Sequence, residues 1–287
     1  MHSWIRGWIA AFVILACVNS ATASAATARL YFDPASGPQT FAAGDIESAL
    51  RARKYSVTRH DSHELRSPPR KADVLILFER TPPGSKDVKA EGFIVTPASH
   101  GGTAAIRVIS DDAAGAMYGG LELAEQIRIH GVEGVRDTRR NPHMSMRGTK
   151  FNIPLDLRSP SYSDMSDSAQ ENIATVWDFE FWRAYLDKLA RDRYNFVSLW
   201  NLHPFPSMVK VPEYPDVALQ DVWRSKIKFD EDYSTRTVGL LTPAMLANKE
   251  VVKQLTIAQK IDFWRRVMQY AKDRNIEFYV MTWNVFT

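Results

Sequence analysis

Polar and aromatic residues cluster near the ends of three predicted strands, where the side chains of parallel strands would converge. Asparagine and histidine supply donors and acceptors for hydroxyl groups, arginine and lysine pair with carboxylates, and tryptophan offers a flat apolar face. A saccharide needs this combination, so we predict a sugar-binding site there. The candidates are Arg147, Lys150 and Asn152 from the first strand, Trp200, Asn201 and His203 from the second, and Trp283 and Asn284 from the third. The alternative is that both tryptophans fill the core or the rim of the sheet.

Carboxyl groups that could act on a glycosidic bond are harder to assign. Hydrolysis usually requires two of them, one on each side of that bond. The long loops contain six candidates, which are Asp156, Asp164, Glu171, Asp230, Glu231 and Asp232. None directly follows a predicted strand, and Asp230-Glu231 lies in a charged loop that is typical of solvated surface. We therefore leave the catalytic residues unknown and expect them beyond Thr287.

An internal echo defines the elements that must position these residues. Phe181-Trp182-Arg183 recurs 82 residues later as Phe263-Trp264-Arg265, and Trp200-Asn201 recurs as Trp283-Asn284. Each copy predicts an amphipathic helix followed at once by an apolar strand, at residues 196–200 and 278–283. A further strand is expected at residues 144–153. The order β-α-β-α-β predicts a parallel sheet with right-handed crossovers.

Loop lengths indicate which edge of that sheet carries function. The helix-to-strand joints are short, whereas the strand-to-helix joints cover 24 residues (154–177) and 54 residues (202–255). Connections of that length are far above the usual few residues. Long loops after the strands are typical of the active face of a (β/α)8 barrel, and less so of an open doubly wound sheet.

The second part of the chain is too short for a whole barrel. A (β/α)8 barrel takes roughly 250 residues, whereas residues 142–287 number 146. We therefore predict an α/β fold in which this part is the first β-α-β-α-β portion of a barrel, truncated after its third strand. A small open sheet is the alternative.

Residues 28–141 predict a separate, small α+β domain. Strands are expected at 28–33 and 73–78, a hairpin pairs 92–96 with 104–109, and helices are expected at 45–54 and after a Ser110 cap. Gly119-Gly120 falls inside the second helix, where close helix packing explains it better than a phosphate loop. Charge and proline at residues 139–142 predict the domain boundary.

The first 25 residues predict an export signal. Arg6 precedes an apolar run that is too short to span a bilayer, and small residues follow with cleavage expected near Ala25. The mature chain would then be soluble and periplasmic or extracellular, with no transmembrane segment. The one cysteine, Cys17, lies in this leader, where a lipoprotein anchor is an alternative to simple removal.

Composition and charge exclude several classes of function. The net charge of +3 comes with no block of Lys or Arg, which argues against nucleic-acid binding. The His60-Asp61-Ser62-His63-Glu64 segment lacks the order of a known metal motif, so no metal site is expected. We expect no cofactor, and the oligomeric state cannot be read from the sequence.

A family resemblance rests on four segments of the first half. They are Gly92-Phe93-Ile94-Val95, the run at 105–119, Asn141-Pro142 and Met146-Arg147-Gly148. Together they resemble the small domain and barrel start shared by β-hexosaminidases and the α-glucuronidases of glycoside hydrolase family 67. The resemblance covers about residues 28–153 and implies an α+β domain ahead of a (β/α)8 catalytic barrel.

The resemblance implies a glycoside hydrolase that acts on polysaccharide-derived glycosides, with an oligo- or polysaccharide as its partner, and the leader predicts that this enzyme is exported. It implies substrate binding by Arg147, whereas the segment at 150–156 departs from the hexosaminidase pattern. The pair Arg147 and Lys150 favours uronic-acid glycosides. The alternatives are a non-catalytic carbohydrate-binding or surface protein, an inactive fragment, or a structural subunit.

Overall fold

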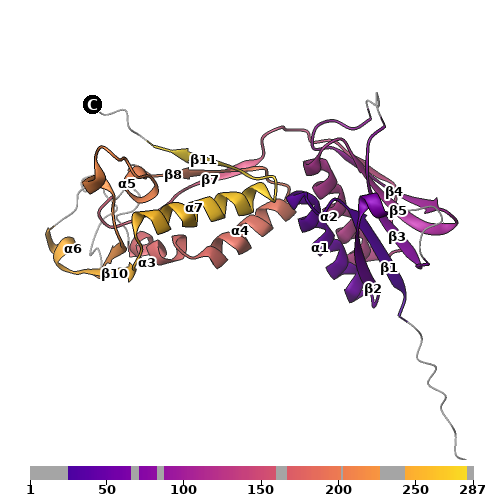
Figure 1. Cartoon of the computed structure of the whole chain (residues 1–287), viewed down its shortest axis with the longest axis horizontal. Helices are drawn as coiled ribbons and strands as arrows, with labels where there is room; N and C mark the ends of the chain where they lie inside the picture. The colour runs from indigo at the N-terminus through magenta and orange to yellow at the C-terminus, as the bar shows by residue number, and fades with distance from the viewer. Residues whose placement is uncertain are drawn as a thin grey trace, which may run out of the picture.

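The chain folds into two units that lie end to end along the long axis of the molecule (Figure 1). The structure is a computed structural model that describes residues 25–65, 71–82, 87–159, 167–201, 203–226 and 243–282. The first unit holds a six-stranded sheet, and the second holds a three-stranded parallel sheet. The expectation of a mixed α/β fold with a parallel sheet is therefore confirmed.

The sheet of the first unit combines a parallel part with an antiparallel hairpin. Its strands are β1 (Thr27–Phe32), β2 (Ser56–Asp61), β3 (Val74–Arg80), β4 (Phe93–His100), β5 (Thr103–Ser110) and β6 (Thr138–Arg140), in the spatial order β2-β1-β3-β5-β4-β6. The first four in that order are parallel, and β4 runs antiparallel to β5 and β6. Gly101 and Gly102 both adopt positive φ in the turn of the expected hairpin.

Two helices, α1 (Gly37–Ala52) and α2 (Ala113–His130), pack against each other between the first sheet and the second unit (Figure 1). The start expected for α1 at residue 45 is wrong, because the Ser36 side chain caps the helix and Pro38 sits in its first turn. The expected Ser110 cap is also wrong. Asp112 caps α2 instead, since its carboxylate accepts from the Gly115 amide at 2.7 Å.

The second unit has the predicted β-α-β-α-β order. Strands β7 (Gly148–Asn152), β8 (Phe196–Trp200) and β11 (Glu277–Met281) are parallel in the order β11-β8-β7. Helices α4 (Phe179–Arg191) and α7 (Ile257–Lys272) lie against one face of this sheet (Figure 1). A capping box of Thr256 and Gln259 begins α7. Strand β7 begins later than the predicted residue 144.

The helices meet that face of the sheet through aromatic side chains. The Trp182 ring lies 6.2 Å from Phe151 of β7 and 5.8 Å from Phe278 of β11, centroid to centroid. It also lies 5.4 Å from Trp264 of α7. Trp182 and Trp264, the helix tryptophans of the sequence echo, are therefore core residues. Their shared packing position explains why the same helix pattern occurs twice.

Both long strand-to-helix connections carry structure of their own. The first contains α3 (Asp167–Val176). The second contains α5 (Phe205–Met208), the 3-10 turn at Pro215–Val217, β9 (Val222–Ser225), α6 (Pro243–Ala247) and β10 (Lys249–Lys253), with β9 and β10 antiparallel. Among the helices that the structure describes, none has the length and apolar character needed to cross a bilayer.

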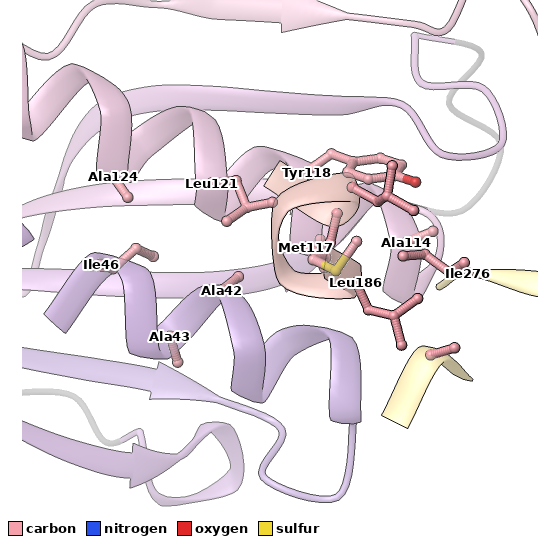
Figure 2. Close-up of a cluster of buried hydrophobic side chains, with 14 of the residues drawn as sticks. Ala42, Ala43, Ile46, Ala114, Met117, Tyr118, Leu121, Ala124, Leu186 and Ile276 are labelled. Carbon is pink, nitrogen blue, oxygen red and sulfur yellow. The ribbon is translucent and has the colours of Figure 1, made fainter. Parts of the chain in front are cut away.

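One hydrophobic core runs through both units. Figure 2 shows Leu186 and Ile276 of the second unit beside Met117 and Tyr118 of α2. All four side chains are buried. The two units are thus packed together through apolar contacts rather than joined only by the chain.

Candidate functional site

The parallel register brings the predicted residues of β7 and β8 onto one face of the small sheet. Lys150 pairs with Ser198, and Asn152 pairs with Trp200. Because side chains alternate along a strand, these four share the face opposite α4 and α7. Val197 and Leu199 point the other way and are fully buried. We call the face that carries the first four residues the open face.

Lys150 and Trp200 form a direct contact on the open face. The Lys150 Nζ atom lies 4.5 Å from the centroid of the Trp200 ring, within the range of a cation–π interaction. The indole Nε1 donates to Ser198 Oγ at 2.9 Å, which fixes the plane of the ring. Lys150 is exposed and forms no ion pair within the described part of the chain. An unneutralised cation therefore lies beside an oriented aromatic surface.

Strand β11 extends the open face on its far edge. Tyr279 and Met281 are exposed by 38% and 39%, although both belong to a strand. The Tyr279 ring packs 5.7 Å from Phe196, and its hydroxyl donates to Glu277 at 2.8 Å. Side chains that alternate along β11 with these residues face the helices. The open face thus presents aromatic and polar groups together across all three strands.

Asn201 and His203 follow β8 but differ in what they can offer a ligand. The buried Asn201 donates from Nδ2 to the Ile153 carbonyl at 2.8 Å, and its Oδ1 accepts from the His203 amide at 2.8 Å. Asn201 thus joins the end of β7 to the start of the loop after β8. The His203 side chain is exposed beside it. Trp283 and Asn284 lie outside the described residues.

The expectation that Arg147 lies at the carboxyl end of the first strand is wrong. Arg147 precedes β7, at its amino end, and its backbone carbonyl accepts from the Asn195 amide just before β8. The guanidinium donates to Glu91 at 2.6 Å and lies 5.5 Å over the Tyr118 ring. Its role is therefore contact with the first unit, at the edge of the sheet opposite Trp200 and Asn152.

Sequence reasoning missed a buried charged cluster after β7. Asp156 is fully buried and forms a two-pronged ion pair with Arg158, at 2.7 and 2.9 Å. The Lys260 ammonium in the first turns of α7 is also buried, 3.9 Å from Asp156, with no hydrogen-bond partner among the described residues. Burial lowers the pKa of Lys260 to about 8. The signal in the sequence was the spacing, because Lys260 lies three residues after Ile257 and four before Trp264, on the apolar face of the helix.

The two acid candidates that the structure describes, Asp156 and Glu171, differ in burial and in their partners. Asp156 is occupied by Arg158 and also accepts from the Trp223 amide at 3.2 Å, whereas Glu171 is exposed on α3. Asp164, Asp230, Glu231 and Asp232 lie outside the described residues. Within the described part of the chain, no group of three or more His, Cys, Asp or Glu side chains could hold a metal ion.

Comparison with solved structures shows a glycoside hydrolase-like fold. A family 138 enzyme (GH138) that targets pectin rhamnogalacturonan II matches 91% of this chain with a TM-score of 0.60 at 19% identity. A family 20 β-N-acetylglucosaminidase matches 90% with a TM-score of 0.46 at 15% identity. The family 20 β-N-acetylhexosaminidase of Streptomyces coelicolor A3(2) matches 89% with a TM-score of 0.45 at 14% identity.

The chain spans 25% of the length of the GH138 enzyme and 39% and 41% of the two family 20 enzymes. No protein-family profile matches it. No curated protein matches it in sequence. The match to the GH138 structure confirms a glycoside hydrolase-like fold and does not favour the family 67 type.

Proposed function

We propose that this chain is the amino-terminal part of an exported glycoside hydrolase that acts on polysaccharide fragments containing uronic acids. In this proposal the second unit is the start of a (β/α)8 barrel, and the open face is the inner face of that barrel. The observation that carries the proposal is the Lys150–Trp200 contact on the open face.

The chemistry of this pair suits an acidic sugar. The edge and face of an oriented indole provide an apolar surface for a pyranose ring, and the adjacent ammonium provides the counterion for a carboxylate. Asn152 stands next to Trp200 in the register and supplies an amide for hydroxyl groups. A neutral saccharide would use the aromatic surface but gain nothing from the cation.

The fold comparison supports the class of enzyme. The GH138 structure, whose fold the chain shares over 91% of its residues, targets a pectin polymer. That likeness and the charge of Lys150 point independently to an acidic polysaccharide. Arg147 has no part in the proposed site, because Glu91 and Tyr118 hold it at the other end of β7.

Calorimetric titration of the chain with trigalacturonate and with cellotriose tests the proposal. We expect trigalacturonate to bind more tightly, and Lys150→Gln to weaken it at least tenfold while it leaves cellotriose within twofold. Trp200→Ala should weaken both ligands. Lys272→Gln, an exposed lysine on α7, is the matched control and should change neither.

Two results would overturn the proposal. One is equal affinity for the charged and the neutral trisaccharide in the wild-type chain. The other is trigalacturonate binding that persists unchanged in Lys150→Gln and Trp200→Ala, since these side chains would then lie outside the site.

A further inference from the structure

The first unit contains a cavity that the proposed function does not use. It has a volume of about 530 Å³ and opens at the carboxyl ends of β1, β3 and β5. That volume falls within the roughly 300–1,000 Å³ typical of ligand pockets. Its lining includes Asp33 after β1, Arg80 at the end of β3 and Asp111 after β5, with Phe78 and Ala116 as an apolar floor.

The topology of the sheet explains why an opening forms there. After β1 the chain passes through α1 and returns as β2 on one side of β1, whereas after β3 it forms the hairpin of β4 and β5 on the other side of β3. The connections that follow the neighbouring strands β1 and β3 therefore run in opposite directions across the sheet. In open α/β sheets, ligands bind in the crevice outside the carboxyl ends of the strands at such a switch point.

Several polar groups around the cavity already have structural partners. The Ser36 hydroxyl caps α1, the Asp112 carboxylate caps α2, and Glu79 forms an ion pair with Arg107. These groups stabilise the helices and the sheet. Because the helix starts are already capped, we do not count them among the groups that would bind a ligand. The ligand-binding capacity must come from the remaining side chains.

Three of the remaining side chains make no hydrogen bond to the residues that the structure describes, whereas Asp33, Gln39 and Ser110 each take part in a local one. The three are the carboxylate of Asp111, the hydroxyl of Ser62 and the imidazole of His63, all of which line the cavity. Arg80 is held at the rim, because its Nη2 donates to the Asp111 carbonyl at 2.9 Å. Acceptors, donors and an apolar floor are therefore gathered in one opening.

The charge of the lining selects the class of ligand. Asp33, Asp111 and Asp112 outweigh Arg80, once Glu79 is neutralised by Arg107. Carboxylates that lack a cation repel anions and accept hydrogen bonds from hydroxyl or ammonium groups. The preference is opposite to that of the Lys150 site on the open face.

We propose that this cavity is a second saccharide site, specific for a neutral or amino sugar and independent of the open face. In this site Asp111 accepts from sugar hydroxyls or an ammonium group, Arg80 donates at the rim, and Phe78 lies beneath the ring. The site belongs to the first unit alone, so it stands even if the function proposed for the second unit fails.

Ligand-observed NMR with glucose, glucosamine and galacturonate tests the proposal. Ala113 is exposed at the start of α2 and lines the cavity, so Ala113→Trp should fill the opening. We expect this variant to weaken glucose and glucosamine at least tenfold. Ala184→Trp, at an exposed position on α4, is the matched control and should leave both unchanged.

Asp111→Asn gives an independent readout with little risk to folding, because its carboxylate is exposed and has no described partner. It should weaken glucosamine at least threefold more than glucose. The proposal is overturned if neither sugar binds the wild-type chain, if Ala113→Trp binds both as well as Ala184→Trp does, or if galacturonate competes equally for the cavity.

Discussion

The carboxylate of Glu91 accepts a hydrogen bond from Asn275 Nδ2 at 3.0 Å, across 184 residues of sequence. The same carboxylate accepts from Arg147 at 2.6 Å and from Asn195 at 3.1 Å. Each of the three donors stands just before one strand of the small sheet. One acidic side chain of the first unit therefore ties together the amino ends of β7, β8 and β11.

Glu91→Ala should lower the free energy of unfolding by about 2–3 kcal/mol. The Arg147 and Glu91 side chains are only 17% and 20% exposed, so the substitution leaves a largely buried guanidinium and two amides without their acceptor. Urea denaturation measures the change. Residue 91 has a positive φ, and alanine, like glutamate, carries a Cβ atom that disfavours this conformation. The difference in unfolding free energy between wild type and Glu91→Ala therefore reports the lost contacts.

Asp262→Asn serves as the control for Glu91. Asp262 pairs with Arg265 at 3.1 Å, but both side chains are more than 70% exposed. An exposed pair contributes roughly 0–1 kcal/mol. A loss in Glu91→Ala no larger than that in Asp262→Asn would contradict the role assigned to Glu91.

Two glycine-to-alanine substitutions should change stability in opposite directions. A Cβ atom at Gly120 of α2 would lie 2.8 Å from the Ala42 Cβ and 2.9 Å from Phe78. Gly120→Ala should therefore destabilise by about 1–3 kcal/mol. At Gly44 of α1 the nearest atom lies 3.8 Å away, so Gly44→Ala should stabilise by about 0.5–1 kcal/mol. Thermal unfolding measures the stability change of each variant. If both substitutions changed stability in the same direction, the close packing of α1 on α2 would be refuted.

The elements of the second unit could be predicted because their signals are local. The Thr256/Gln259 capping box and the helix stripes around Trp182 and Trp264 depend on spacings of three to seven residues. The close packing at Gly119-Gly120 followed from glycines within a helix pattern. The early start of α1 was missed because the hydrophobic stripe was weighted above the Ser36-Gly37-Pro38 signal.

The site was harder to predict because its contacts join distant segments. Nothing near Arg147 in the sequence shows that Glu91, 56 residues earlier, holds its guanidinium. The Lys150–Trp200 contact likewise depends on strand register, which the pattern alone does not fix. The buried Lys260 depends on the packing of the loop after β7 against α7.

The stability of the chain should rise with pH between about 8 and about 10.5 through Lys260. Burial lowers the pKa of Lys260 to about 8 in the folded chain, whereas the unfolded chain keeps the ordinary value of 10.5. In that window the unfolded state binds more protons, so deprotonation favours folding. The gain is on the order of 3 kcal/mol from the size of the pKa shift.

Lys260→Met provides the test of this pH dependence. It removes a buried charge while Asp156 keeps its pair with Arg158, so it should be more stable than wild type at pH 7. Its advantage should shrink as the pH rises from 8 to 10. Denaturation of both proteins across that range gives the difference in their free energies of unfolding. The titration of the tyrosines cancels in this difference, because both proteins contain them. A constant difference would show that Lys260 does not titrate there.

A crystal structure of the chain soaked with digalacturonate shows whether Lys150 and Trp200 bind an acidic sugar. We expect one sugar ring to lie against Trp200 on the open face, with its carboxylate within hydrogen-bond distance of Lys150 Nζ. Electron density for the sugar that is absent from the open face at saturating ligand, or that places the carboxylate away from Lys150, would contradict this expectation.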